Sequence, residues 1–225
     1  MTYASRIITP VIKWLLMACC RIDTHELKKV PRKGPLIIVV NHINFLEVPV
    51  IYTFLYPRQV VGIIKEETWD SFLLGLLADA WEAIPLDRYN SDMSAMRRAS
   101  EALKRGCILA IAPEGTRSGN GELQRGHGGI VSLAVRNHAV ILPLAHYGGE
   151  RFWENLKSLR RTRFSIRVGT PFYLKEPSGR GMKAVRSEMT DEIMYQIARL
   201  LPPAYRGVYA DIEKATTHHL EFVSL

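Results

Sequence analysis

The stretch at residues 36–49, L-I-I-V-V-N-H-I-N-F-L-E-V-P, decides the fold expected for this chain. Its first five residues are an unbroken apolar run rich in β-branched side chains, which predicts a strand buried on both faces. Pro49 favours a helix that starts there, because proline is tolerated in the first helical turn. His42 is therefore expected at the carboxyl end of a central strand, the edge at which open α/β sheets bind ligands.

A carboxylate, Glu47, follows His42 by five residues. On an ideal helix two such positions lie about 140° apart, so only a turn between them can bring the side chains together. If they meet, His42 is a candidate general base and Glu47 the carboxylate that orients it. The alternative is a histidine that ends a strand beside a solvated glutamate, and the spacing alone does not separate the two interpretations.

The rest of the chain alternates between strand and helix patterns. Strands are predicted at residues 60–64, 83–85, 107–112, 139–145 and 164–168, and helices at residues 50–55, 69–80, 92–105 (with Asp92 as its N-cap), 130–136 and 182–201. This order predicts one α/β domain with a mostly parallel central sheet flanked by helices, and 225 residues suit a single domain. Residues 34–225 are assigned to this domain, and residues 1–33 to an N-terminal helix and a basic connector.

The N-terminal helix is expected to contact a membrane without crossing it. Residues 7–20 are apolar, but Pro10 and Lys13 interrupt them, and bilayer crossing takes about 20 apolar residues. They also lack a signal-peptide cleavage site. A helix with Trp14 on its apolar face and Arg6 and Arg21 beside it could lie in the headgroup plane. The alternative is a helix packed on the core.

The net charge of +8 is concentrated in one segment. Residues 151–186 hold ten basic and two acidic side chains, so this segment carries a charge equal to that of the whole chain. Such a concentration suits anionic lipid, a polyphosphate or nucleic acid, or is simply a solvated face. Few aromatic residues interleave with it (Phe152, Trp153 and Phe164), so no nucleic-acid partner is expected. The three cysteines, Cys19, Cys20 and Cys107, lack metal or disulfide spacing, which predicts a reducing compartment and no metal site.

A second polar segment, A-P-E-G-T-R-S at residues 112–118, follows the strand predicted at 107–112. Exposed backbone N–H groups around Gly115, together with the Arg117 guanidinium, would suit a phosphate monoester. Arg88 follows a different predicted strand and is a second candidate for the same phosphate.

Four ordered blocks of this sequence resemble the glycerolipid (PlsC-type) acyltransferases, typified by 1-acylglycerol-3-phosphate acyltransferases. The blocks are N-H-I-N-F-L-E at 41–47, I-P-L-D-R at 84–88, P-E-G-T-R-S at 113–118 and V-I-L-P-L-A at 140–145. The chain departs from the family pattern in three places. Glu47 stands where the family usually has aspartate, W-E-A at 81–83 replaces the usual glycine, and G-H-G-G at 126–129 replaces a frequent lysine.

The resemblance implies transfer of a fatty acyl group from acyl-CoA or acyl-carrier protein to a hydroxyl of a lysophospholipid or glycerol phosphate. His42 would be the base and Glu47 its partner. The resemblance places Arg88, Glu114, Gly115, Thr116 and Arg117 in the acceptor site. Neither a metal nor a cofactor would be needed, because the thioester is already activated.

The implied location is peripheral, on an anionic cytoplasmic membrane face. Two alternatives stay open: a catalytically silent lipid-binding protein on the same fold, and a hydrolase that releases the acyl group to water. No G-x-S-x-G nucleophile motif is present.

Overall fold

The structure is a computed structural model that describes residues 2–87, 93–176 and 181–224. Its strands are β1 (Cys20–Asp23), β2 (Leu36–Val40), β3 (Val60–Lys65), β4 (Ile84–Leu86), β5 (Ile108–Ile111), β6 (Ile141–Tyr147), β7 (Thr162–Val168), β8 (Phe172–Leu174) and β9 (Leu220–Phe222). Its α-helices are α1 (Tyr3–Cys19), α2 (Glu47–Phe54), α3 (Phe72–Ala80), α4 (Met93–Lys104), α5 (Gly129–Asn137), α6 (Phe152–Lys157) and α7 (Met182–Ala198). Short 3₁₀ turns are η1 (His25–Lys29), η2 (Glu66–Asp70), η3 (Pro203–Tyr205), η4 (Gly207–Tyr209) and η5 (Ile212–Lys214).

Across the described ranges the strands form one nine-stranded sheet in the order β1-β7-β6-β2-β5-β3-β4, with β8 paired to β6 and β9 to β8. Strands β2 to β6 run parallel to one another, whereas β7 and β8 lie antiparallel to β6. The predicted mostly parallel α/β sheet is thus confirmed. Because the parallel strands share a direction, the loops that follow β2, β5 and β6 emerge at one edge of the sheet.

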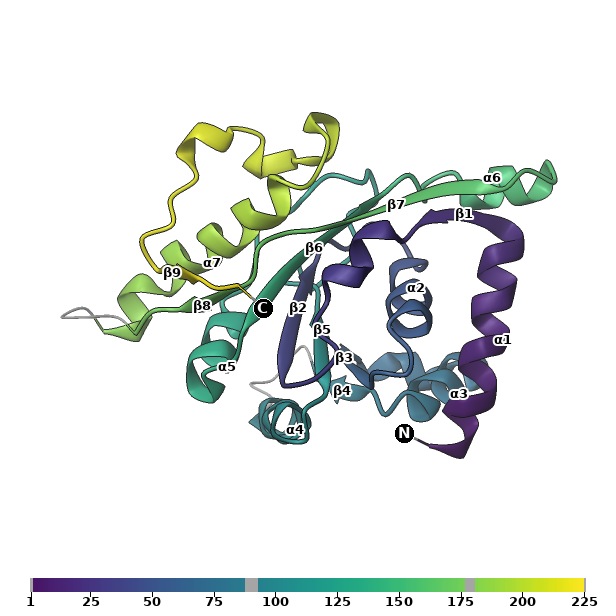
Figure 1. Cartoon of the computed structure of the whole chain (residues 1–225), viewed down its shortest axis with the longest axis horizontal. Helices are drawn as coiled ribbons and strands as arrows, with labels where there is room; N and C mark the ends of the chain where they lie inside the picture. Colours follow the sequence, from purple (N-terminus) through teal and green to yellow (C-terminus); the bar gives the residue numbers. More distant parts are fainter. Residues whose placement is uncertain (1, 88–92, 177–180, 225) are drawn as a thin grey trace.

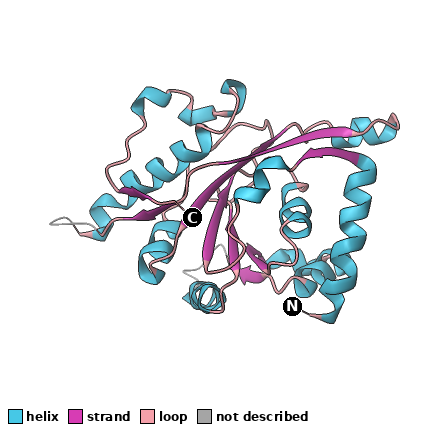
Figure 2. Ribbon diagram, in the orientation of Figure 1, coloured by secondary structure: helices cyan, strands magenta, loops and turns pink. Residues whose placement is uncertain are grey.

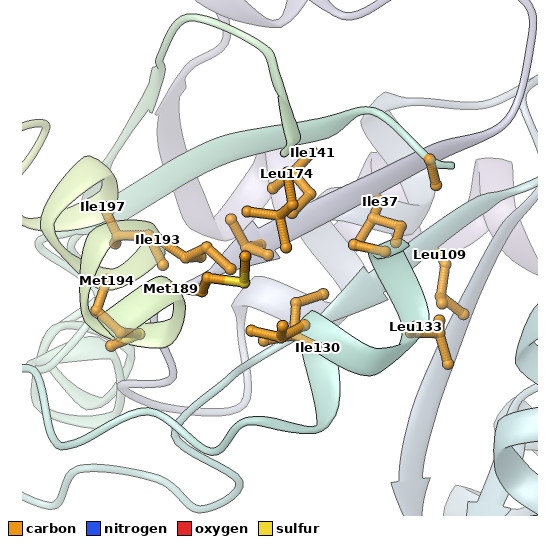
Figure 3. Packing of buried hydrophobic residues seen from close by; sticks show 14 of the residues in the cluster. Ile37, Leu109, Ile130, Leu133, Ile141, Leu174, Met189, Ile193, Met194 and Ile197 are labelled. Carbon is orange, nitrogen blue, oxygen red and sulfur yellow. The ribbon is translucent and has the colours of Figure 1, made fainter. Parts of the chain in front are cut away.

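Two apolar cores cover the two faces of the sheet, because successive residues of β2 point in opposite directions. Ile37 and Val39 face α4, α5 and α7, while Ile38 and Val40 face α1 and α2. Figure 1 and Figure 2 show these two groups of helices on opposite sides of the strands. Figure 3 shows the first core, in which residues of α7 and α5 pack on the strands: Met189, Ile193 and Ile197 from α7, Ile130 and Leu133 from α5, and Ile37, Leu109 and Ile141 from the sheet. All five residues of β2 are buried, as the apolar run predicts.

The predicted element positions are mostly correct, and the differences have local causes. Helix α2 begins at Glu47 rather than Pro49, because the Asn44 side chain accepts a hydrogen bond from the Leu46 amide (2.8 Å) and turns the chain earlier. Pro49 still falls in the first turn, where its missing N–H breaks no helical hydrogen bond. The helix predicted at 69–80 is divided into η2 and α3, and the Trp69 indole folds back to donate to Asp79 (2.8 Å). The predicted Asp92 cap lies outside the described residues.

The N-terminal segment is joined to the sheet rather than separate from it. Cys20, which we expected at the end of the first helix, instead begins β1, and β1 pairs in parallel with β7. The Arg161 guanidinium donates to the carbonyl of Cys20 (2.6 Å) and secures this junction. Within the described ranges, no helix combines the length and apolar character that crossing a membrane requires.

Candidate active site

His42 lies in the loop that leaves the carboxyl end of β2, as predicted. Its Nδ1 contacts Glu47 Oε1, so the turn brings together the two side chains that the spacing alone left undecided. Because an ionised carboxylate can only accept, Nδ1 carries the shared proton and Nε2 keeps a free lone pair. The His42 side chain is 18% exposed and that of Glu47 only 3%. The pair therefore has one edge open to substrate and one edge buried.

Glu47 is the first residue of α2. A carboxylate at a helix N-terminus is favoured by the aligned peptide dipoles, which supports its charge in a buried position. Its second oxygen, Oε2, lies 3.8 Å from Nε2 of His146 and has no hydrogen-bond partner among the residues that the structure describes.

Glu114, in the loop after β5, braces the loop after β2. It is buried, and its Oε1 accepts the main-chain N–H of His42 (2.7 Å) while its Oε2 accepts that of Gln124 (2.9 Å). Burial raises the pKa of the Glu114 carboxyl, and these two N–H donors oppose that rise. The Ser118 amide also donates to the His42 carbonyl (2.8 Å). The main-chain N–H and C=O of His42 are thus both held by the loop at 112–118.

Three other predicted acceptor-site residues, Gly115, Thr116 and Arg117, follow Glu114 in the same loop. Gly115 has a φ of +68°, which favours glycine, and a Cβ there would lie 3.1 Å from the His127 ring. Thr116 and Arg117 are exposed, so both can reach a ligand in solvent. Arg88 lies outside the described residues, so its predicted role stays a prediction. Within the described part of the chain, no cluster of three or more His, Cys, Asp or Glu residues is arranged to hold a metal ion.

Sequence reasoning did not find His146, which lies on β6 behind the pair. Its ring stacks on Phe164 (5.1 Å between centroids, 10° between planes). Its Nε2 contacts the Asn41 carbonyl (2.8 Å), and its main-chain N–H and C=O bond to the Asn41 side chain (2.9 Å each). The fourth motif block ends at Ala145, so nothing in the motif pointed to the next residue.

Comparisons with known proteins point to one family. The sequence model of the family described as Acyltransferase matches residues 21–147, more than half of the chain. A 1-acyl-sn-glycerol-3-phosphate acyltransferase from Bacillus subtilis is 23% identical over 180 residues, which cover 80% of this chain and 87% of the relative. A lyso-ornithine lipid O-acyltransferase from Pseudomonas aeruginosa is 27% identical over 137 residues, which cover 59% of this chain and about half (52%) of the relative.

Among solved structures, the 1-acyl-sn-glycerophosphate acyltransferase PlsC from Thermotoga maritima shares the fold. It has a TM-score of 0.57 at 19% sequence identity, covering 88% of this chain and 78% of that one. The family match contains His42, Glu47 and the Glu114 loop. The chain belongs to the acyltransferase family.

Proposed function

We propose that this acyltransferase moves a fatty acyl group from an acyl thioester to a free hydroxyl of a lysophospholipid or glycerol phosphate. The observation that carries the proposal is the contact between His42 Nδ1 and Glu47 Oε1. This contact leaves Nε2 as the base on the partly exposed side of the ring. The names of the relatives support the substrate class, because both act on a lipid that already carries an acyl chain.

The chemistry follows from these two side chains. Nε2 of His42 removes the proton of the acceptor hydroxyl while the hydroxyl oxygen attacks the thioester carbonyl. Glu47 stabilises the imidazolium that forms. The tetrahedral intermediate then collapses to the oxygen ester and expels the thiolate, which takes the proton from the imidazolium. The donor is acyl-CoA or acyl-carrier protein, and no covalent enzyme intermediate is needed.

The acceptor phosphate would bind beside the loop at 112–118. The Arg117 guanidinium is exposed there, and Gly115 is exposed on the same turn, although its N–H already donates to the Ala112 carbonyl (3.0 Å). Arg88 is proposed as a second phosphate ligand, on sequence grounds alone. Thr116 is exposed next to Arg117 in the chain and can donate its hydroxyl. Both oxygens of Glu114 are taken by main-chain donors, so we assign it to the support of the loop rather than to ligand.

The test is replacement of His42. His42→Ala should lower kcat by about 10²–10⁴, the usual contribution of a general base, and leave the fold unchanged. His25→Ala, which removes an exposed histidine, is the matched control. Product formation is measured by mass spectrometry with a panel of lysolipids and acyl donors. Near-normal transfer by folded His42→Ala would refute the assignment.

The same assay separates the two alternatives. Thioester cleavage that proceeds equally without acceptor would indicate a hydrolase. A parent protein that binds lysolipid but cleaves no thioester would be a silent binding protein. A silent binding protein has no need of a buried carboxylate held against the imidazole of His42, so this contact favours an enzyme over that alternative.

We also propose that α1 rests on an anionic bilayer, at the cytoplasmic face. Helix α1 buries the polar residues Ser5 and Thr9 against the protein, whereas most of its large apolar side chains are exposed to solvent. The exposed apolar residues of α1 are Tyr3, Ile7, Val11, Trp14, Leu15 and Met17, and those of the neighbouring helix α3 are Phe72, Leu73, Leu74 and Leu76. The Thr2 hydroxyl donates to the Ala80 carbonyl (2.9 Å), which ties the two helices together.

An anionic bilayer fits this surface by charge as well as by apolar character. Arg6 and Arg21 are exposed on or beside α1, and basic residues near a membrane surface each add about 1 kcal/mol of attraction to anionic lipid. In sedimentation with phosphatidylcholine vesicles containing phosphatidylglycerol, Trp14→Glu and Phe72→Glu should each reduce binding. Ser187→Glu, an equal charge change at an exposed site on α7, should not. Equal binding by all three variants, or dimerisation through this surface, would contradict the proposal.

A further inference from the structure

His146 is buried in the sheet directly behind the proposed catalytic pair. It is 1% exposed, in a strand whose other residues are apolar up to Tyr147. Its ring lies flat on Phe164 of the neighbouring strand, which fixes the ring plane. Its Nδ1 has no hydrogen-bond partner among the described residues, so the polar contacts of the ring are made by Nε2.

Its first partner is Asn41, the residue before His42. The Asn41 carbonyl can only accept, so the Nε2 of His146 at 2.8 Å must carry the proton. Two further hydrogen bonds, each 2.9 Å, join the Asn41 side chain to the His146 main chain. Together the three bonds link β6 to the end of β2. The main chain that enters His42 is therefore fixed from β6.

Its second partner is Glu47. The same Nε2–H lies 3.8 Å from Glu47 Oε2, the oxygen that makes no hydrogen bond among the described residues. The carboxylate consequently lies between two imidazoles, with Oε1 on His42 and Oε2 towards His146. The partial positive charge of this N–H group therefore lies near the buried negative charge, although its hydrogen bond is made to the Asn41 carbonyl.

The charge state of His146 suits this role. Burial lowers the pKa of the His146 ring, while the nearby Glu47 carboxylate opposes the effect. The other titratable groups that act on it are His42, which lowers the pKa further, and Glu150, which raises it. A neutral ring supplies a dipole, whereas a charged one would compete with His42 for Glu47.

We propose that His146 is a positioning residue of the acyl transfer: its Nε2–H holds the Asn41 main chain and faces the Glu47 carboxylate, so that His42 is aligned for the acceptor hydroxyl. The inference rests on the proposed function, since it concerns the same base. His146 would act through Asn41 and Glu47, without touching the substrate or the reacting atoms.

Two variants at position 146 separate the N–H donor from the volume of the ring. His146→Leu removes the donor and fills the space, whereas His146→Gln keeps an N–H of similar reach. Ile166→Val, at the position opposite His146 on β7, is the control for a small packing change. His146→Leu should lower kcat about threefold to tenfold, the range of one lost neutral hydrogen bond, with both KM values within about twofold. His146→Gln should recover part of the loss.

The pH dependence of kcat/KM distinguishes loss of the N–H donor from loss of packing, because a packing change alone should not shift it. Without the His146 dipole, the Glu47 carboxylate holds the imidazolium of His42 more tightly. The acid limb of kcat/KM in His146→Leu should therefore shift to higher pH, and Ile166→Val should leave it in place. An NMR titration of the His42 ring protons follows the same midpoint without any substrate.

The substrate-free titration separates this inference from the proposed function. If the protein transfers no acyl group yet the His42 midpoint rises in His146→Leu, the positioning contact stands and the function is wrong. If the parent is active and neither kcat nor the midpoint changes in folded His146→Leu, the inference is wrong. Equal losses in His146→Leu, His146→Gln and Ile166→Val would also overturn it, because the cause would then be packing.

Discussion

Replacement of Glu114 tests whether this residue supports the site or contacts the ligand. Its carboxylate accepts two main-chain N–H groups, from His42 (2.7 Å) and Gln124 (2.9 Å). A hydrogen bond to a charged group contributes about 1.5–3 kcal/mol, and the cost of burying the charge, which raises the carboxyl pKa, offsets part of the sum. We therefore expect Glu114→Ala to lower the free energy of unfolding by about 2–4 kcal/mol. Glu114→Gln keeps one accepting oxygen and should cost about 1–2 kcal/mol.

The measurement combines stability with kinetics. A loss of about 2–4 kcal/mol in a protein of this size lowers Tm by roughly 4–16 °C. Activity is then compared well below both Tm values, where kcat should fall because the His42 main chain has lost its acceptor. Glu122→Ala, an exposed acid in the same loop, is the matched control and should change neither quantity. An unchanged Tm together with a higher KM for the phosphorylated acceptor would show that Glu114 contacts the ligand and does not support the loop.

Three further predictions concern charges elsewhere. Glu47→Gln should lose most activity and Glu47→Asp should keep some, because the negative charge beside His42 matters more than one methylene; equal kcat for Glu47→Gln and the parent would contradict the pair. Arg117→Ala should raise KM for the acceptor about 10- to 150-fold and leave the donor KM unchanged, and an effect on the donor alone would reassign this arginine to the phosphates of the donor. The hydrogen bond from Arg167 lowers the pKa of Asp23, so this link stabilises the fold above the unfolded value of about 3.8 and is lost as pH falls through the lower folded value. Arg167→Gln should cost about 0.2–1 kcal/mol at pH 6 and little at pH 2 in urea unfolding, and a constant difference would exclude the link.

The sequence predicted the centre of the sheet better than its borders. Strand β2 was predicted at its observed bounds, because five apolar residues buried on both faces leave little ambiguity. Strands β1, β8 and β9 and helix α6 were not predicted. They are three to six residues long, and the strands exist through pairing of β1 with β7, β8 with β6 and β9 with β8, which no local pattern reveals. The chain after α7 was likewise left without elements, because its three 3₁₀ turns have no apolar period.

The candidate site shows the same division between local and distant information. The contact between His42 and Glu47 spans five residues and could be anticipated from the turn between them. Glu114 was predicted in the acceptor site, but its two main-chain partners, which depend on how the loops after β2 and β5 meet, could not be predicted. His146 is 105 residues from Asn41, and only the pairing of β2 with β6 brings them together. A histidine in an apolar run reads from sequence as an ordinary core residue.

The main-chain hydrogen bonds of His42 have a consequence for how the site opens. The His42 N–H donates to the buried Glu114 carboxylate and the Ser118 N–H donates to the His42 carbonyl, so these two amide protons lie between the loops that follow β2 and β5. These two strands lie in the middle of the sheet. Exchange of these protons with solvent then requires the two loops to part, so we expect it to be slower than that of exposed loop amides. The loop after β2, although it carries no regular structure, should exchange together with the strands that anchor it.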